Sequence, residues 1–390
     1  MALGAIDEAW NDDIYEDVES ANYESVVVYS RDWTVETIIN QISQGNIDLN
    51  PKFQRRNAWN DEKRSRLIES LIIGIPIPEI VLAEDPLKKK SFIVIDGKQR
   101  LLTIHGFVDP TIGYWDQSEL RWLHTRKELN GLTFENLLTD PELHYIFRAF
   151  MNSDIRCTVI SSYNSPDILY DIFYRLNTGS VPLSTQELRQ VLNKGPFADA
   201  LVQHTNNKIP LHSVLHLSEP DPRLRDIEVV LRSLSFELYG TDYKGNLKDF
   251  LNESMRHLKT AWKEDREKVE NLLHQFDRAT EQAISVLGAE RVGRKYVDGK
   301  WERRFNKSVF ETELYYFWRT PKEKIDKVNK KKFVNEFKEL CEHNTDFRKS
   351  IEATTKTNEN YHTRFSLMKD LFNSAFGLNI SDIPVKTAKE

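Results

Sequence analysis

The chain has 390 residues, of which 39% are hydrophobic and 11% aromatic, and its formal net charge is −6. This length and apolar content predict a globular protein of two or three domains and exclude wholesale disorder. The weakly negative charge also excludes a basic field over the whole protein, so any DNA contact must come from a local patch.

Cysteine usage and the apolar segments indicate a cytoplasmic protein. The two cysteines, Cys157 and Cys341, lie far apart in the sequence without neighbours at metal-ligand spacing, so we expect reduced thiols. The N-terminus lacks the plan of a signal peptide, and the most apolar stretch, 67–82, is interrupted by acidic residues and prolines. We therefore expect no export signal and no membrane partner.

The first segments are an acidic tail, an apolar run and a helix. Residues 1–24 are rich in Asp, Glu and Asn and predict a tail, and an apolar run follows at 25–30. Thr34 is a suitable N-cap for a helix whose apolar residues recur at helical spacing up to Gly45. The alternation at 47–49 indicates a short strand.

A polar, basic loop with two large aromatic residues spans 51–59. In one interpretation, Phe53 and Trp59 anchor the loop to a core while its polar side chains stay solvated. In the other, Gln54 and Arg55 reach a functional site. A helix with a clear apolar stripe and a short strand follow this loop.

The stretch 92–107 is the centre of the predicted site. Its apolar run, its glycine turn and the helical spacing after it predict a strand, a tight turn and a helix. The N–H groups of the helix's first turn, joined by Lys98 and Arg100, would make an anion site with Asp96 at its mouth. The alternative is an ordinary connection, because Asp-Gly pairs are common in turns.

A strand and two helices follow the central motif. Alternation predicts the strand at 155–160, and helical spacing predicts the first helix at 166–177. The Ser-Thr-Gln-Glu sequence at 184–187 is a capping box that opens the second helix. At the bend between the helices, Arg175 and Asn177 either close the first helix or reach into the site.

The second half of the chain, from about residue 220, predicts long helices and few strands. An irregular insert at 291–305 combines basic and aromatic residues, which is the composition of a local DNA contact. A hairpin with a solvated basic face explains the same residues. The candidate DNA-binding residues are Arg294, Lys295, Lys300, Trp301, Arg303 and Arg304.

Several catalytic motifs are missing from the sequence. There is no His-Glu-x-x-His pattern, no paired cysteine motif, no Gly-x-Ser-x-Gly elbow and no Walker-type loop. These absences disfavour zinc hydrolases, serine hydrolases and P-loop enzymes. A Mg²⁺ held mainly by nucleotide phosphates and by one carboxylate, Asp96, is still consistent with the sequence.

Several motifs in a fixed order carry a family resemblance. They are Pro-x-Phe-Gln-Arg at 51–55, Leu-Ile-Glu-Ser at 67–70, Pro-Ile-Pro at 76–78, Asp-Gly-Lys-Gln-Arg-Leu at 96–101 and Leu-Asn-Thr-Gly at 176–179. This set resembles the N-terminal domain of GmrSD-type restriction endonucleases, a family whose fold is similar to that of ParB and sulfiredoxin. The similarity covers roughly residues 30–240.

The resemblance implies a fold class, a domain plan and a ligand. We expect an α+β protein in which a ParB/sulfiredoxin-like mixed α/β core at 25–215 precedes a mainly helical domain at 216–390. The family pattern implies that the core binds a nucleoside triphosphate with Mg²⁺. It further implies that hydrolysis controls the cleavage of modified or invading phage DNA.

The same resemblance assigns roles to residues of the motifs. Asp96, Gln99 and Arg100 would be catalytic, with Asp96 as the catalytic or metal-side carboxylate and the other two contacting phosphate or orienting water. Gly97 would allow a phosphate to approach closely. The further phosphate-binding candidates are Gln54, Arg55, Lys98, Arg175 and Asn177.

Two features depart from the family pattern. Lys98 replaces the usual first glutamine of the Asp-Gly-Gln-Gln-Arg motif, which could strengthen phosphate binding or alter turnover. The C-terminal half has no His-Asn-His nuclease motif of the kind that many relatives carry. DNA cleavage by this chain alone is therefore not expected.

Three hypotheses follow. In the leading one, the chain is an NTP-binding and NTP-hydrolysing component of a bacterial anti-phage, restriction-type defence system that acts on DNA. In the second, the same core is a ParB-like, Mg²⁺-dependent DNA nuclease. In the third, it is a non-enzymatic DNA-binding adaptor for a separate nuclease. The hypotheses leave room for a separate nuclease subunit and for a homodimer.

Overall fold

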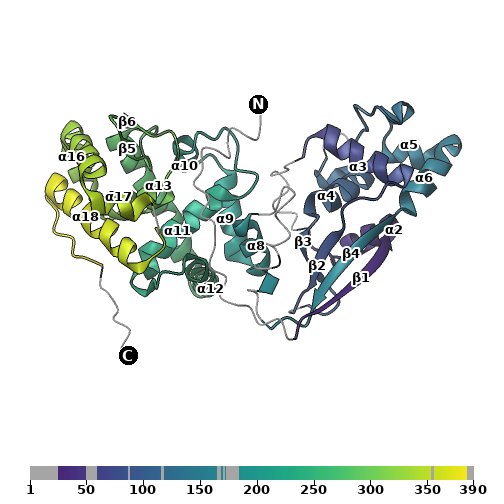
Figure 1. The fold of residues 1–390 in the computed structure, drawn as a ribbon, viewed down its shortest axis with the longest axis horizontal. Coiled ribbons are helices and arrows are strands. Elements are labelled where there is room, and N and C mark those ends of the chain that lie inside the picture. Colours follow the sequence, from purple (N-terminus) through teal and green to yellow (C-terminus); the bar gives the residue numbers. More distant parts are fainter. Residues whose placement is uncertain are drawn as a thin grey trace. The chain divides into compact units, whose positions relative to one another are not determined.

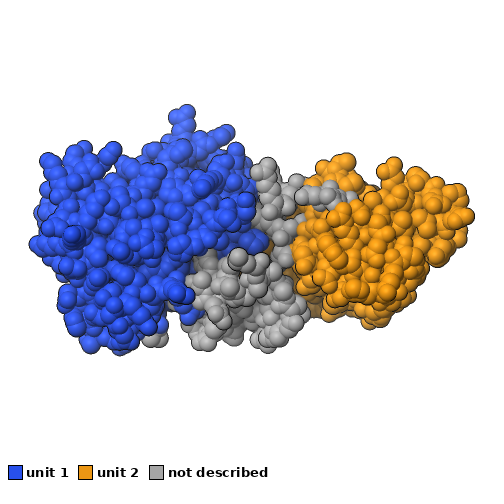
Figure 2. Space-filling model, turned by 90° about the horizontal axis from the view of Figure 1, so that it is seen from above, with its two compact units in different colours: residues 1–16, 193–390 blue, residues 17–192 orange. Residues whose placement is uncertain are grey.

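Two compact units make up the chain (Figure 2). The computed structural model describes residues 25–49, 59–86, 88–115, 118–164, 168–169, 172, 184–352 and 355–383. One unit holds the described residues up to Leu192, and the other holds those from Asn193 onward. The first is a mixed α and β unit and the second is helical, which confirms the predicted α+β class.

A four-stranded mixed sheet forms the centre of the first unit (Figure 1). Its strands are β1 (Val27–Thr34), β2 (Ile80–Glu84), β3 (Phe92–Asp96) and β4 (Asp154–Ser161). The spatial order is β1-β4-β2-β3, with β2 and β4 parallel and the other two neighbouring pairs antiparallel. Strands β3 and β4 lie within one residue of the predicted apolar runs at 92–95 and 155–160, whereas the expected strand at 47–49 is a single bridge from Ile47 to Phe92.

Helices cover both faces of this sheet. They are α2 (Val35–Ser43), α3 (Asp61–Ile73), α4 (Lys98–Val108), α5 (Phe134–Thr139), α6 (His144–Met151) and α8 (Thr185–Leu192). Successive residues of β2 belong to different hydrophobic clusters. Leu82 lies in the cluster with α2, α3, α4 and α6, and Val81 lies in the cluster with α8. Because side chains alternate along a strand, the two clusters lie on opposite faces. The short helices α5 and α6 have no counterpart among the predicted elements.

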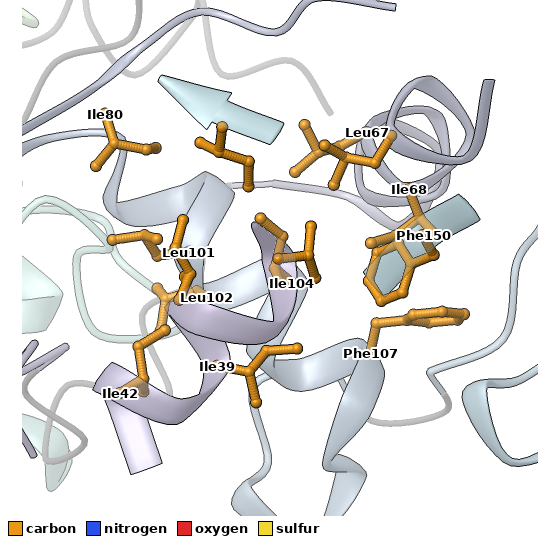
Figure 3. Close-up of a cluster of buried hydrophobic side chains, with 14 of the residues drawn as sticks. Ile39, Ile42, Leu67, Ile68, Ile80, Leu101, Leu102, Ile104, Phe107 and Phe150 are labelled. Carbon is orange, nitrogen blue, oxygen red and sulfur yellow. The ribbon is translucent and has the colours of Figure 1, made fainter. Parts of the chain in front are cut away.

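Helix α4 is the most deeply buried helix of the site. Leu101, Ile104 and Phe107 are each 0% exposed and point into the larger cluster (Figure 3). Phe107 packs edge-on against Phe150 of α6, with ring centroids 5.5 Å apart, and Ile68 of α3 lies in the same cluster. This packing fixes where the N-terminus of α4 meets the end of β3.

The second unit is built from ten helices in its described residues. They are α9 (Pro196–Asn206), α10 (Pro210–Val214), α11 (Arg225–Tyr239), α12 (Leu247–Glu264), α13 (Arg266–Leu287), α14 (Lys307–Arg319), α15 (Lys322–Lys327), α16 (Lys330–His343), α17 (Thr345–Glu352) and α18 (Asn358–Phe376). A hairpin of β5 (Tyr296–Val297) and β6 (Lys300–Trp301) interrupts them. None of the described helices is both long enough and apolar enough to cross a membrane.

The boundary between the units lies earlier than the sequence indicates. We expected the helical domain to begin at 216, where long helical patterns take over. Helices α9 and α10 instead pack against α11, α12 and α13, so residues from Asn193 onward pack with the helical unit. Short helices carry a weak periodic signal, which explains the difference.

A buried ionic network joins three helices of the second unit. Glu311 of α14 accepts hydrogen bonds from Arg232 of α11 (Nη2 to Oε2, 2.8 Å) and from Arg364 of α18 (Nη2 to Oε1, 2.6 Å). The side chain of Glu311 is 1% exposed. One carboxylate therefore balances two guanidinium groups inside the helical unit.

Removing this carboxylate should destabilise the helical unit. We expect Glu311→Ala to lower the free energy of unfolding by about 3–5 kcal/mol, because buried Arg364 loses its carboxylate partner and Arg232 keeps only Glu228, 4.0 Å away. Urea denaturation followed by circular dichroism measures the change. The control is Glu339→Ala, since that side chain is 71% exposed and its loss should change the free energy by at most about 0.5 kcal/mol. Equal effects of the two variants would contradict a structural role for the network.

Candidate functional site

The turn between β3 and α4 has a backbone that only glycine fits well. Gly97 is the N-cap of α4 and has φ = 93°, in the left-handed region. A Cβ at this position would lie 2.4 Å from Cδ1 of Ile80, which is closer than real contacts allow. Gly97 has no side chain to cap the helix, so the first-turn N–H groups of α4 point out of the helix end, as they do in anion sites.

Arg100 is tied back across this turn. Its Nη2 donates to Oδ2 of Asp96 (2.8 Å) and to the carbonyl of Glu79 (3.0 Å), and the residue is only 7% exposed. Its Nε is buried and has no hydrogen-bond partner among the described residues. The Cβ that Gly97 lacks would lie 3.3 Å from this Nε, so the unused donor lies directly beside the turn. Buried donors without partners are rare in folded proteins.

A second cation and two further carboxylates lie near the same turn. Lys98 is half-buried, and burial lowers its pKa, while the nearby carboxylates of Glu187 and Asp48 raise it in part. Glu187 also accepts a hydrogen bond from the N–H of Ser184 (2.6 Å), and its own N–H donates to Oγ of Ser184 (3.1 Å). The predicted capping box is thus confirmed, and it brings α8 to the turn.

The structure brings together five of the predicted site residues in one turn, from Asp96 to Arg100. Gln99 contributes a buried Oε1 without a partner in the described chain, and the side chain of Asp96 is 25% exposed. The sequence indicates Glu79 only as a carboxylate near the motif and Glu187 only as part of the capping box, whereas their interactions with Arg100 and Lys98 depend on tertiary packing. Four further candidates, Gln54, Arg55, Arg175 and Asn177, lie outside the described residues.

The basic insert at 291–305 forms a hairpin, which is one of the two interpretations of its sequence. Arg294 is 2% exposed and donates to the carbonyls of Val292 (3.0 Å) and Val214 (2.9 Å). This burial corrects the expectation that Arg294 contacts DNA, because its guanidinium instead holds the insert against the unit. Burial also lowers its pKa to about 10.

The other residues of the insert differ in their exposure. Lys295 lies between Glu302 (3.3 Å) and Glu352 (3.0 Å), and the ring of Trp301 stacks on Phe337 at 5.8 Å. Both residues are therefore engaged within the unit. The exposed candidates are Lys300, Arg303 and Arg304.

Metal ligands are scarce in the part of the chain that the structure describes. No group of three or more His, Cys, Asp or Glu residues there could hold a metal ion. The bond from Arg100 uses one oxygen of Asp96, and that carboxylate keeps access to solvent. A Mg²⁺ at this turn would therefore need nucleotide phosphates for most of its ligands.

The comparison with protein families identifies the domain that carries this turn. Residues 35–192 match the model of the GmrSD restriction endonuclease, N-terminal domain. No curated protein matches the chain. The matched residues include β2, β3 and β4 of the sheet, the β3–α4 turn and the capping box of α8. Residues 35–192 of this chain therefore form a domain of the GmrSD restriction endonuclease N-terminal family.

Proposed function

We propose that the β3–α4 turn binds and hydrolyses a nucleoside triphosphate, and that this reaction controls how a bacterial restriction-type defence system acts on foreign or modified DNA. Two observations support the proposal. The matching family is described as a restriction endonuclease. The turn also combines a helix N-terminus with a buried arginine that has one donor unused. The state of Arg100 is the observation that carries the proposal.

The residues of the turn would have different roles in binding and transferring a phosphate group. The first-turn N–H groups of α4 and Nε of Arg100 are donors for phosphate oxygens, and Lys98 adds positive charge. The carboxylate of Asp96 would hold Mg²⁺ together with the phosphates, and the ion would neutralise charge that develops during transfer. Gln99 would orient the attacking water. The phosphate-binding role stays a prediction for four further residues, Gln54, Arg55, Arg175 and Asn177.

The Asp96 and Arg100 pair provides the most direct test of this proposal. We expect phosphate release from at least one of the four NTPs with Mg²⁺, and a loss of about 100-fold or more in Asp96→Asn and in Arg100→Ala. The matched controls are Asp32→Asn and Arg156→Ala, which break an exposed pair (3.0 Å) on the same sheet. These controls should keep the wild-type rate.

Other outcomes of the same assays would support the rival hypotheses. Nicking of plasmid DNA with Mg²⁺ and no nucleotide would indicate a nuclease instead. Salt-sensitive DNA binding with neither activity would indicate an adaptor. If wild type releases no phosphate from any NTP, with or without DNA, the proposal fails.

Gly97→Ala tests the geometry of the turn. The variant should be destabilised by about 1–3 kcal/mol from its positive φ and further by the contact of the new Cβ with Ile80. Gly74→Ala is a matched control, because Gly74 has φ = 80° and nothing within 4 Å of an added Cβ. Urea denaturation should show a larger loss for Gly97→Ala than for Gly74→Ala.

The double variant Gly97→Ala with Ile80→Val removes Cδ1 of Ile80, the atom that the new Cβ would meet. It should recover part of the stability that Gly97→Ala loses, because it relieves the contact but not the positive φ. Equal stability of the two glycine variants would show that the space beside Gly97 is not restricted.

A further inference from the structure

A hollow lies on the surface of the first unit, at the N-terminus of α3. Its volume is about 520 Å³, which is within the range of small-molecule sites. The lining residues are Asn60, Asp61, Glu62, Trp122 and His124. None of them belongs to the β3–α4 turn, and none was a candidate on the basis of sequence.

Trp122 is held outward by its neighbours in the chain. It is 55% exposed and has φ = 56°, which is rare for a bulky residue. The N–H of Arg121 donates to Oγ of Ser65, and the N–H of Leu123 donates to Oδ1 of Asn130, both at 2.9 Å. Such strained residues persist where the surrounding structure fixes them, and they occur often at functional sites. The indole is thus presented on a fixed backbone as an open aromatic surface.

Asp61 and Glu62, which we call the acceptor wall, also line the hollow. Carboxylates accept hydrogen bonds and, when ionised, cannot donate them. Asp61 is paired with Arg64 (2.9 Å) and Glu62 with Arg66 (3.3 Å), so the acidic charge is balanced by arginines. The wall therefore suits an uncharged ligand that carries hydrogen-bond donors.

Cations and aromatic rings flank the hollow on both sides in sequence. Lys63 lies over the ring of Trp59, 4.7 Å from its centroid. Arg126 is paired with the carboxylate of Glu128, and Tyr145, whose hydroxyl helps to raise the pKa of Arg126, is 56% exposed. Cations that follow a phosphate backbone, interleaved with rings on which bases stack, are typical of surfaces that bind single-stranded nucleic acid. This setting favours a base within a strand over an isolated small molecule.

The hollow is separate from the β3–α4 turn. Arg64 lies over the ring of Trp115 (5.9 Å), and Oγ of Ser118 donates to the carbonyl of Gly106 (2.6 Å). The segment that leads to Trp122 therefore lies against the C-terminal half of α4. The turn is at the other end of this 11-residue helix, about 12 Å from Gly106 along its axis.

From this arrangement we infer that the hollow beside Trp122 binds an unpaired cytosine or adenine base of a DNA strand. The base stacks on the indole, and its exocyclic amino group donates to the carboxylate of Asp61 or Glu62. This inference deepens the proposed function, from which it takes only that the protein meets DNA. It adds a base-reading surface apart from the nucleotide turn.

Fluorescence anisotropy with labelled single-stranded oligonucleotides, without NTP, tests this site. Wild type should bind oligo-dC and oligo-dA more tightly than oligo-dT, because thymine has no exocyclic amino group. Trp122→Ala should weaken binding of oligo-dC by about 10-fold or more, and Trp122→Phe should keep most of it. Leu138→Ala is the control, since Leu138 is 48% exposed but does not line the hollow.

A second variant tests the acceptor wall without changing its shape. Replacing Asp61 and Glu62 by Asn and Gln should reduce the ratio of the affinities for oligo-dC and oligo-dT, while the loss of two negative charges raises the affinity for oligo-dT. Equal binding of oligo-dC and oligo-dT by wild type, or unchanged binding in Trp122→Ala, would overturn the inference. If cytidine monophosphate competes with an affinity equal to that of the oligonucleotide, the inference that the base belongs to a DNA strand is wrong.

Phosphate release in the same variants separates this inference from the proposed function. Trp122→Ala should keep phosphate release, and Arg100→Ala should keep oligonucleotide binding. If wild type releases no phosphate but shows the expected base preference, the proposed NTP reaction fails while the base site stands. Loss of both activities in Trp122→Ala, with Trp122→Phe equally impaired, would indicate a merely structural role for Trp122.

Discussion

The burial of helix α4 is the constraint on which the candidate site depends. Leu101, Ile104 and Phe107 are fully buried between the sheet and the helices α2, α3 and α6. Each such side chain contributes about 1.5–3 kcal/mol when it leaves water. A helix anchored in this way cannot shift along its axis without losing that energy. Its first turn is therefore held at the end of β3, and Asp96 is held within 2.8 Å of Arg100.

Gly97 connects this packing to the chemistry of the turn. The missing Cβ leaves room for Ile80 on one side and for the guanidinium of Arg100 on the other. The guanidinium of Arg100 can therefore lie against the turn, with its Nε next to Gly97. Electrostatic interactions are stronger at such a buried position than in water, which is why an unused donor there is costly without a ligand and effective with one.

Local rules account for the parts of the fold and site that were predictable. Thr34 caps α2, and Ser184 and Glu187 form the capping box of α8, because each cap depends on residues three or four apart. The turn from Asp96 to Arg100 was predictable for the same reason. Its partners at Glu79 and Glu187 were not, since tertiary packing brings them there.

Burial and backbone strain were beyond the reach of the sequence. Arg294 has the composition of a DNA contact, but its acceptor at Val214 is 80 residues away in the chain. Trp122 gave no signal at all, because its exposure depends on the hydrogen bonds that its neighbours Arg121 and Leu123 donate to Ser65 and Asn130. In both cases contacts between distant segments decide whether a side chain faces solvent.

Hydrogen–deuterium exchange at the β3–α4 turn tests the central claim most directly. First-turn amides of a helix lack intrahelical partners, so a bound phosphate should slow their exchange. We predict protection of residues 97–101 when a non-hydrolysable NTP and Mg²⁺ are added, and no such protection in Arg100→Ala. If calorimetry detects bound nucleotide while exchange at 97–101 stays unchanged, the phosphates lie elsewhere and the assignment of this turn is wrong.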